Sequence, residues 1–168
     1  RLLEKLGQKI RRDARPKMRR EGTTMTLLKS WVQSANNAKT PFPLNNLPYG
    51  VFSTPDTTAR CGVAIGDMIL DLAALEQTGL IDITVEPMFD VPFWNEVMEH
   101  GPMVWSALRT RLMSLLEDGS SGQEFLQNHL TAQRDALMHM PFLVSEFTDF
   151  YASKHHATNV GTMFRGAQ

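Results

Sequence analysis

The fold is decided by residues 62–72, whose sequence is GVAIGDMILDL. Two short apolar runs, residues 62–65 and 68–72, flank the dipeptide Gly66-Asp67. A two-residue loop with glycine at its first position is a strong hairpin signal, because a type II′ turn requires a positive φ there. This stretch therefore predicts two antiparallel strands joined by a tight turn.

Another strand is expected just upstream of this hairpin. Pro41, Pro43 and Pro48 forbid regular structure, and a Pro-Tyr-Gly turn then leads into the apolar residues Val51 and Phe52. Short strands joined by tight turns suggest a small barrel. The expected fold class is α+β, mainly β with added helices.

Three helices are expected near these strands, one before them in the chain and two after them. Leu27, Leu28, Trp31 and Val32 recur at helical spacing, which predicts a short amphipathic helix within residues 25–37. A helix of one or two turns is predicted at residues 73–77, closed by Gly79. Asp90, followed by Pro92 in the first turn, predicts a helix through His100.

Two later apolar stripes also have helical spacing. The first ends at Asp118-Gly119 and consists of Trp105, Leu108, Leu112, Leu115 and Leu116. For the second, Ser121 and Glu124 form a capping-box pattern before Phe125, Leu126, Leu130 and Leu137. Both stripes are interpreted as core or domain-packing faces. His100, His129 and His139 are scattered singly and are interpreted as structural.

The net charge of −1 conceals a strongly basic start to the chain. Residues 1–24 carry nine of the 17 Lys and Arg residues but only three of the 18 acidic residues. An Arg-rich segment suits a nucleic-acid-binding arm or a transit peptide. The favoured interpretation is upstream sequence outside the fold, with Met25 as the natural start and no nucleic-acid partner.

Cysteine content and hydropathy indicate the cellular setting. Cys61 is the single cysteine of the 168 residues, so an internal disulfide is excluded. No apolar run resembles a secretory signal or is long enough to cross a bilayer. These observations predict a cytoplasmic protein with no membrane partner.

The densest chemistry of the chain is in residues 148–165, TDFYASKHHATNVGTMFR. Asp149, Tyr151, His156 and Arg165 are the candidate functional side chains. In one helix Asp149 and His156 would lie on the same face, about 10 Å apart along the axis. Arg165 would project from the opposite side, and it can join them only if the helix ends first, which is expected at Gly161.

The local start of this helix is also predictable. Ser153 is a plausible N-cap, which leaves residues 149–151 in an extended approach. Structural roles remain alternatives for these residues: a carboxylate near a helix start is usually a cap or a partner of the helix dipole. Adjacent His155 and His156 point about 100° apart, so they rarely bind one metal together.

Several motifs together resemble the fumarylacetoacetase family, which hydrolyses a carbon–carbon bond late in tyrosine and phenylalanine breakdown. They are residues 148–151 (TDFY), 156–161 (HATNVG) and 163–165 (MFR), and upstream residues 46–53 (NLPYGVFS), 62–67 (GVAIGD) and 70–72 (LDL). The resemblance covers about residues 41–168. It implies residues 25–140 as an SH3-like amino-terminal domain with appended helices, and residues 141–168 as the incomplete beginning of the catalytic domain.

The resemblance implies a role for each candidate side chain. Asp149 would be a ligand of calcium or magnesium, since hard cations prefer carboxylate oxygens. His156 would be the general base that activates water. Tyr151 and Arg165 would bind the substrate, a small diketo acid. His155 is assigned no role.

The resemblance also implies that the full-length enzyme is a homodimer. Its remaining metal ligands, a partner that orients the histidine and the oxyanion-binding groups would lie beyond Gln168. The 168-residue chain alone is therefore expected to be inactive, because one carboxylate rarely holds these cations firmly. Two alternatives stay open, a related acylpyruvate hydrolase and an inactive fragment that only packs against a partner.

Overall fold

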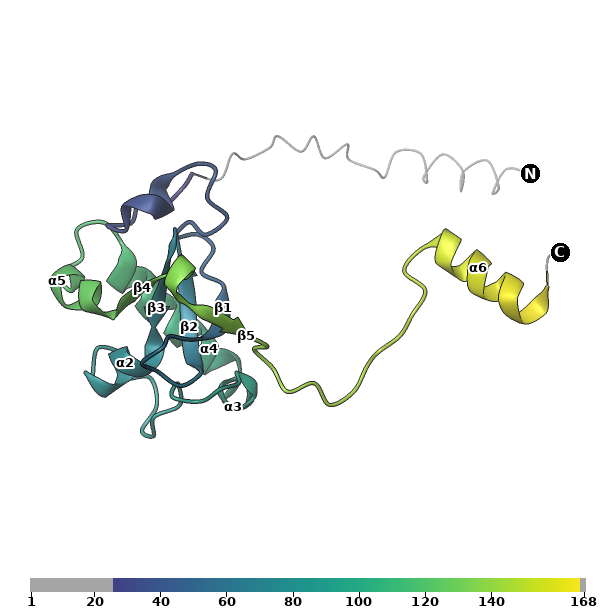
Figure 1. The fold of residues 1–168 in the computed structure, drawn as a ribbon. Coiled ribbons are helices and arrows are strands. Elements are labelled where there is room, and N and C mark those ends of the chain that lie inside the picture. Colours follow the sequence, from purple (N-terminus) through teal and green to yellow (C-terminus); the bar gives the residue numbers. More distant parts are fainter. Residues whose placement is uncertain (1–25, 167–168) are drawn as a thin grey trace, which may run out of the picture.

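The computed structural model describes residues 26–166, in which a small β-sheet is surrounded by helices (Figure 1). In chain order the elements are η1 (Gln33–Asn36), β1 (Tyr49–Ser53), β2 (Arg60–Ile65), β3 (Met68–Asp71), α2 (Leu72–Gln77), α3 (Asn95–Glu99), α4 (Gly101–Leu116), α5 (Gln123–Leu126), η2 (Gln127–His129), β4 (Leu130–Ala132), η3 (Gln133–Asp135), β5 (Leu137–His139) and α6 (Lys154–Arg165). The expected α+β class is confirmed. The basic segment 1–24 and Met25 lie outside the described residues.

The five strands form one antiparallel sheet in the order β4-β3-β2-β1-β5. β4 and β5 therefore occupy opposite edges, although only residues 133–136 connect them. A flat five-stranded sheet would separate its edges by about 19 Å. Since three of the four connecting residues form the compact helix η3, which rises only about 2 Å per residue, the sheet must curl into a half-barrel.

The predicted hairpin is confirmed. β2 and β3 pair so that Ile65 lies opposite Met68, which leaves Gly66-Asp67 as a two-residue loop. Gly66 has a φ of 59°, whereas Asp67 is not among the residues with positive φ, as a type II′ turn requires. A Cβ at Gly66 would also lie 2.2 Å from the Oγ of Ser34, so both backbone conformation and space demand glycine here.

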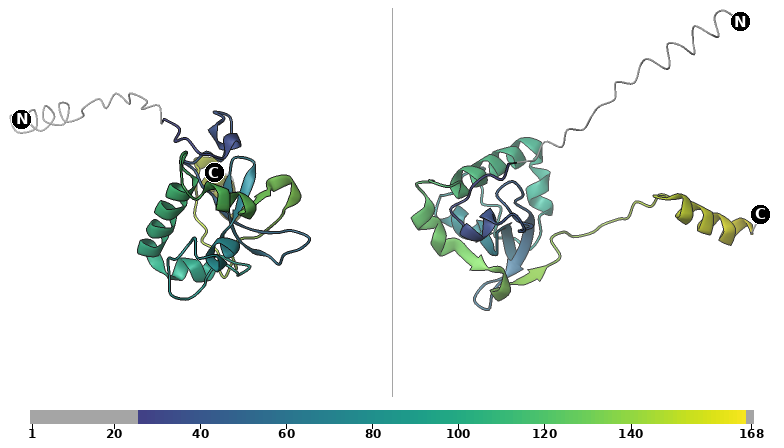
Figure 2. Two further views of the ribbon diagram at one scale, coloured as in Figure 1. Left: turned by 90° about the vertical axis from the view of Figure 1, so that its left-hand side faces the viewer. Right: turned by 90° about the horizontal axis from the view of Figure 1, so that it is seen from above.

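The two faces of the sheet have different neighbours. Val63 and Ile65 of β2 point into the main core, where they join Leu108 and Leu112 of α4. Figure 2 shows α4 lying along this side of the sheet. The opposite face carries Gly62 and Ala64 of β2 beside the larger side chains of Phe52 and Ile69, and it forms the concave side of the half-barrel.

The short helix α2 confirms the prediction for residues 73–77, one residue longer at its start. Asp71 is its N-cap, because its carboxylate accepts a hydrogen bond from the backbone N–H of Ala74 at 3.0 Å. The same carboxylate lies 3.4 Å from the guanidinium of Arg60. Gly79 follows the helix with a φ of 72°, as expected for a residue that ends it.

The helix expected within residues 25–37 is wrong, since only η1 forms there. Instead, Ser30 bridges to Glu117, and the Trp31 indole N–H donates to the carbonyl of Leu115 at 2.9 Å. This segment therefore pairs with the carboxyl end of α4 instead of forming a helix of its own. Helical spacing of four apolar residues could not reveal this long-range pairing.

The helix expected from Asp90 to His100 is also wrong in its first half, because α3 begins only at Asn95. The carboxylate of Glu76 accepts hydrogen bonds from the backbone N–H groups of Met88 and Phe89 at 2.9 and 3.2 Å. The carbonyl of Phe89 accepts from the N–H of Cys61. These contacts hold the chain against the sheet and away from a helical path.

The second apolar stripe forms strands rather than a continuous helix. α5 ends at Leu126, its N-cap is Gly122, and no side chain caps it, so the capping box predicted for Ser121 and Glu124 is wrong. Leu130 pairs with Leu70 in β3, and Leu137 pairs with Ser53 in β1. Pairing across the sheet overrode the local pattern. Within residues 26–166, no helix has the length and apolar character to span a bilayer.

Candidate active-site segment

The chain leaves the half-barrel at a defined point. The backbone N–H of Trp94 donates to the carbonyl of Pro141 at 2.8 Å. The side-chain amide of Asn95 then makes two hydrogen bonds to the backbone of Leu143, at 2.9 and 3.1 Å, as a neighbouring strand would. Residues 144–152 beyond this anchor have no regular structure and are exposed (Figure 1).

Ser153 begins α6 as predicted. Its hydroxyl oxygen accepts a hydrogen bond from the backbone N–H of His156 at 3.2 Å, which satisfies one of the free amides of the first turn. The expected irregular approach through residues 149–151 is confirmed. His156 is therefore the third residue of α6, with its backbone held by the cap.

Two candidate side chains meet at this helix start. The rings of Tyr151 and His156 have their centroids 5.3 Å apart and their planes at 76°, a T-shaped arrangement. Aromatic rings prefer this geometry because the positive edge of one ring faces the negative face of the other. The spacing of the two residues had not predicted this contact.

The helix break expected at Gly161 is wrong, since α6 continues to Arg165. A glycine inside a helix costs only about 1 kcal/mol, and the helix ends at Gly166, which has a φ of 76°. Arg165 lies nine residues beyond His156, so it projects from the opposite side of α6. The condition for bringing these two side chains together is therefore not met in this helix.

Asp149 lies in the exposed segment before α6 and makes no hydrogen bond or ion pair within residues 26–166. Its carboxylate is thus accessible to a cation. In the same part of the chain no three His, Cys, Asp or Glu side chains are grouped closely enough to hold a metal ion. Asp149 could contribute one ligand, and a complete site needs others.

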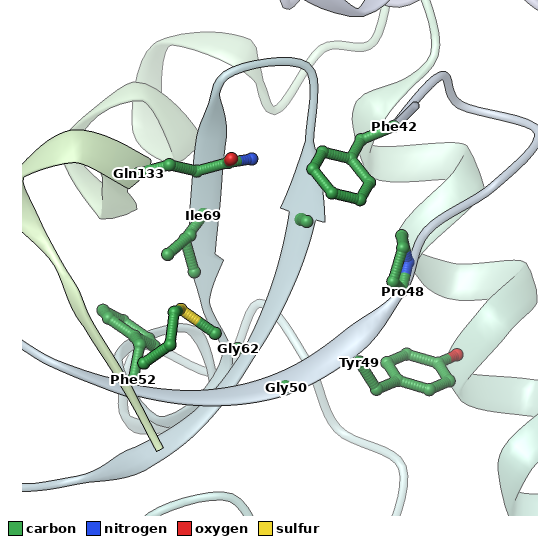
Figure 3. Close-up of a pocket in the computed structure, with 10 residues that line it drawn as sticks. Phe42, Pro48, Tyr49, Gly50, Phe52, Gly62, Ile69 and Gln133 are labelled. Atoms are coloured by element: carbon green, nitrogen blue, oxygen red, sulfur yellow. The ribbon is translucent and has the colours of Figure 1, made fainter. Parts of the chain in front are cut away.

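A cavity of about 300 Å³ opens on the concave side of the half-barrel (Figure 3). It is lined by Phe42, Pro48, Tyr49, Gly50, Phe52, Gly62, Ala64, Ile69, Gln133 and Met138. Gly50 and Gly62 pair directly across β1 and β2. A Cβ at Gly62 would lie 2.7 Å from the Phe52 ring, so glycine allows that ring to cover the sheet.

A second apolar cavity of about 230 Å³ lies beside α3 and α4, lined by Tyr49, Trp94, Val97, Met98, Trp105 and Leu108. Burial raises the pKa of the Tyr49 hydroxyl, and the nearby Arg109 guanidinium opposes this shift. Neither of these two cavities is lined by a carboxylate, an imidazole or a thiol. Both are suited to packing rather than to acid–base chemistry. A third cavity, whose lining includes Lys39 and Asp67, has no imidazole or thiol. Residues 148–165 are the candidate site because a carboxylate, a phenol and an imidazole occur there within eight residues.

Comparisons with known proteins find matches over most of this chain. The family model described as fumarylacetoacetase N-terminal matches residues 45–141, which include all five strands. Fumarylacetoacetase of Bos taurus is 43% identical over 134 residues, which are 76% of this chain and 32% of that protein. Those of Dictyostelium discoideum and Arabidopsis thaliana are 38% and 36% identical over 86% of this chain, covering 35% and 36% of their own lengths. The chain thus spans about a third of the length of these relatives.

Proposed function

The chain belongs to the fumarylacetoacetase family, and from this premise we propose that it contributes to an enzyme that hydrolyses fumarylacetoacetate to fumarate and acetoacetate. In this proposal residues 25–140 form the amino-terminal domain, and residues 141–168 begin the catalytic domain. The single observation that carries it is a segment with an accessible carboxylate, a phenol and an imidazole, directly after a half-barrel that matches the family. A cytoplasmic homodimer without nucleic-acid or membrane partners completes the proposal.

Asp149 is assigned as one ligand of a calcium or magnesium ion. Its carboxylate supplies the hard oxygen that both cations prefer, and its exposure leaves that oxygen free to bind. Because residues 26–166 contain no cluster of possible metal ligands, the other ligands must come from elsewhere in the full protein. When bound, the ion would stabilise the negative charge of the enolate that leaves the substrate.

His156 is assigned as the general base. Its imidazole accepts a proton from water, and the resulting hydroxide attacks the carbonyl carbon next to the bond to be broken. That carbon–carbon bond then breaks, its electron pair passes to the departing enolate, and a proton completes the acetoacetate product. The hydroxyl of Tyr151 donates a hydrogen bond to a substrate oxygen. The T-shaped contact supports a shared role for these two residues.

Arg165 is assigned to the substrate carboxylate, which a planar guanidinium can bind through two parallel hydrogen bonds. Its place at the far end of α6, on the side opposite His156, gives this assignment the weakest geometric support of the four. Binding one substrate with both residues requires the last turn of α6 to unwind, and Gly161 is the residue at which this costs least.

The test is hydrolysis of a 1,3-diketo acid by a protein that extends this sequence to the length of its relatives. We expect cleavage that is lost with His156→Ala, and weaker metal binding with Asp149→Ala. The 168-residue chain alone is expected to show no cleavage. Turnover by the isolated chain that depends on His156 would contradict the need for further ligands, and unchanged metal affinity would remove Asp149 from the site.

Two other functions are distinguished by the same assay. A related acylpyruvate hydrolase would cleave acylpyruvates in preference to fumarylacetoacetate. A chain that acts only as a packing module would bind a catalytic partner while His156→Ala changed nothing. The apolar lining of both half-barrel cavities is the observation that favours this second alternative.

A further inference from the structure

The start of α6 holds His156 from two sides. Its backbone N–H is bonded to the hydroxyl of Ser153, which fixes the path of the main chain. The ring of Tyr151, two residues before this N-cap, contacts its imidazole edge to face. A similar arrangement, the hydrophobic staple, uses a side chain before the N-cap to fix the first turn of a helix.

The contact between the two rings restricts rotation of the His156 side chain rather than the path of the backbone. Within residues 26–166 His156 is otherwise exposed, so no core packing in that part of the chain limits its rotamers. An exposed side chain changes rotamer within nanoseconds, and a general base must present its nitrogen to water in one orientation. A ring placed against the imidazole lowers the number of accessible orientations.

We propose that Tyr151 is a positioning residue for His156: its aromatic ring holds the imidazole in the orientation from which it activates water. This inference rests on the proposed role of His156 as the general base. It adds a second task to Tyr151, because the ring acts on His156 whereas the hydroxyl acts on the substrate. The two tasks can be separated by substitution.

Tyr151→Phe keeps the ring and removes the hydroxyl, whereas Tyr151→Leu removes both. The energy of an aromatic pair corresponds to about a 2- to 12-fold change in the population of the paired rotamer. Phe150→Leu is the matched control, because it removes a neighbouring exposed ring for which no pairing with His156 is observed.

The first measurement uses the 168-residue chain and needs no activity. NMR at one fixed pH compares the imidazole protons of His156 with those of His155, which points about 100° away around α6. Tyr151→Leu should move the His156 signals toward those of His155, while Tyr151→Phe and Phe150→Leu should leave them in place. An unchanged His156 signal in Tyr151→Leu would overturn the inference.

The second measurement uses the longer protein described above. Tyr151→Leu should have a kcat about 2- to 12-fold lower than that of Tyr151→Phe, whereas both variants should raise KM because both lack the hydroxyl. Equal kcat values for the two variants would overturn the positioning role. An inactive wild-type protein would instead contradict the proposed function, and the NMR comparison would still decide whether Tyr151 orients His156.

Discussion

The half-barrel of residues 26–141 and the segment of residues 142–166 are stabilised by different kinds of interaction. Every residue classed as buried in the described chain belongs to the half-barrel, including all of the core from Trp31 to Leu126. The later segment has none, although Phe147, Phe150 and Phe164 are large and apolar. The half-barrel is thus stabilised by burial, and α6 only by local contacts such as its N-cap.

This difference teaches that the two regions respond to different changes. Removal of buried atoms should unfold the half-barrel and leave α6 unaffected, whereas changes of helix propensity should alter α6 alone. A helix of 12 residues is marginal by itself in water. The following predictions test that separation, beginning with the largest expected effect.

Leu112→Ala should lower the free energy of unfolding of the half-barrel by about 2–5 kcal/mol, because the fully buried Leu112 side chain leaves a cavity between α4 and the sheet. Urea denaturation followed by tryptophan fluorescence measures the change. Leu143→Ala is the matched control, since that side chain is 57% exposed and its removal should cost almost nothing. A similar loss in both variants would show that the later segment shares the core.

Alkaline pH should destabilise the half-barrel through Cys61. Burial, and then the nearby Glu76 carboxylate, raise the pKa of this thiol to about 12 in the folded state. The unfolded thiol, with its ordinary pKa near 9, loses its proton first. The stabilisation is therefore complete below pH 9 and is lost as the pH rises toward 12, by about 2–3 kcal/mol at pH 11.

Cys61→Ala isolates this contribution from the titration of other groups. The free energy of unfolding should fall less steeply above pH 9 in the variant than in the wild type. The measurement is a urea titration of both proteins at pH 8, 10 and 11. Parallel pH profiles would contradict a buried, protonated thiol.

Gly62→Ala should destabilise the half-barrel by about 1–3 kcal/mol, because the added methyl group would overlap the rings and methyls that cover the sheet. The new Cβ would lie 2.7 Å from Phe52 and 2.8 Å from Ile69. Thermal unfolding measures the loss. Gly122→Ala is the control in the same region, since its Cβ would have contacts no closer than 3.5 Å.

Gly161→Ala should act in the opposite direction and on α6 alone, by stabilising the helix by about 1 kcal/mol. A Cβ at Gly161 meets no atom within 4 Å, so only helix propensity changes. Circular dichroism should show more helix, with no shift in the unfolding of the half-barrel. No gain in helicity would indicate that α6 does break at Gly161, as the sequence had suggested.

Local patterns predicted those parts of the fold that depend on neighbours in sequence. The Gly66-Asp67 turn, the two strands beside it, the cap at Ser153 and the buried stripe of α4 each follow from residues within about one turn of one another. The errors at residues 25–37, 90–94 and 121–137 have one cause. In each, backbone groups or side chains are engaged by partners far away in the chain, such as Glu76 for residues 88 and 89.

The candidate site also has features that the local sequence predicts and features that it does not. Its residue types and order could be read directly, since a carboxylate, a phenol and an imidazole within eight residues stand out in any chain. The contact between Tyr151 and His156 could not be inferred from a spacing of five residues. It forms where the backbone is extended at Ser153, with φ of −143° and ψ of 156°, between Tyr151 and the first turn of α6.

The sequence by itself determined the hairpin, the family and the chemistry available in residues 148–165, because each is encoded in adjacent residues. Only the tertiary structure decided that β4 and β5 form the two edges of a half-barrel and that Asn95 anchors the departing chain at Leu143. These features arise from pairings over long sequence separations. Free energies of that kind are summed over the whole fold and leave no local pattern.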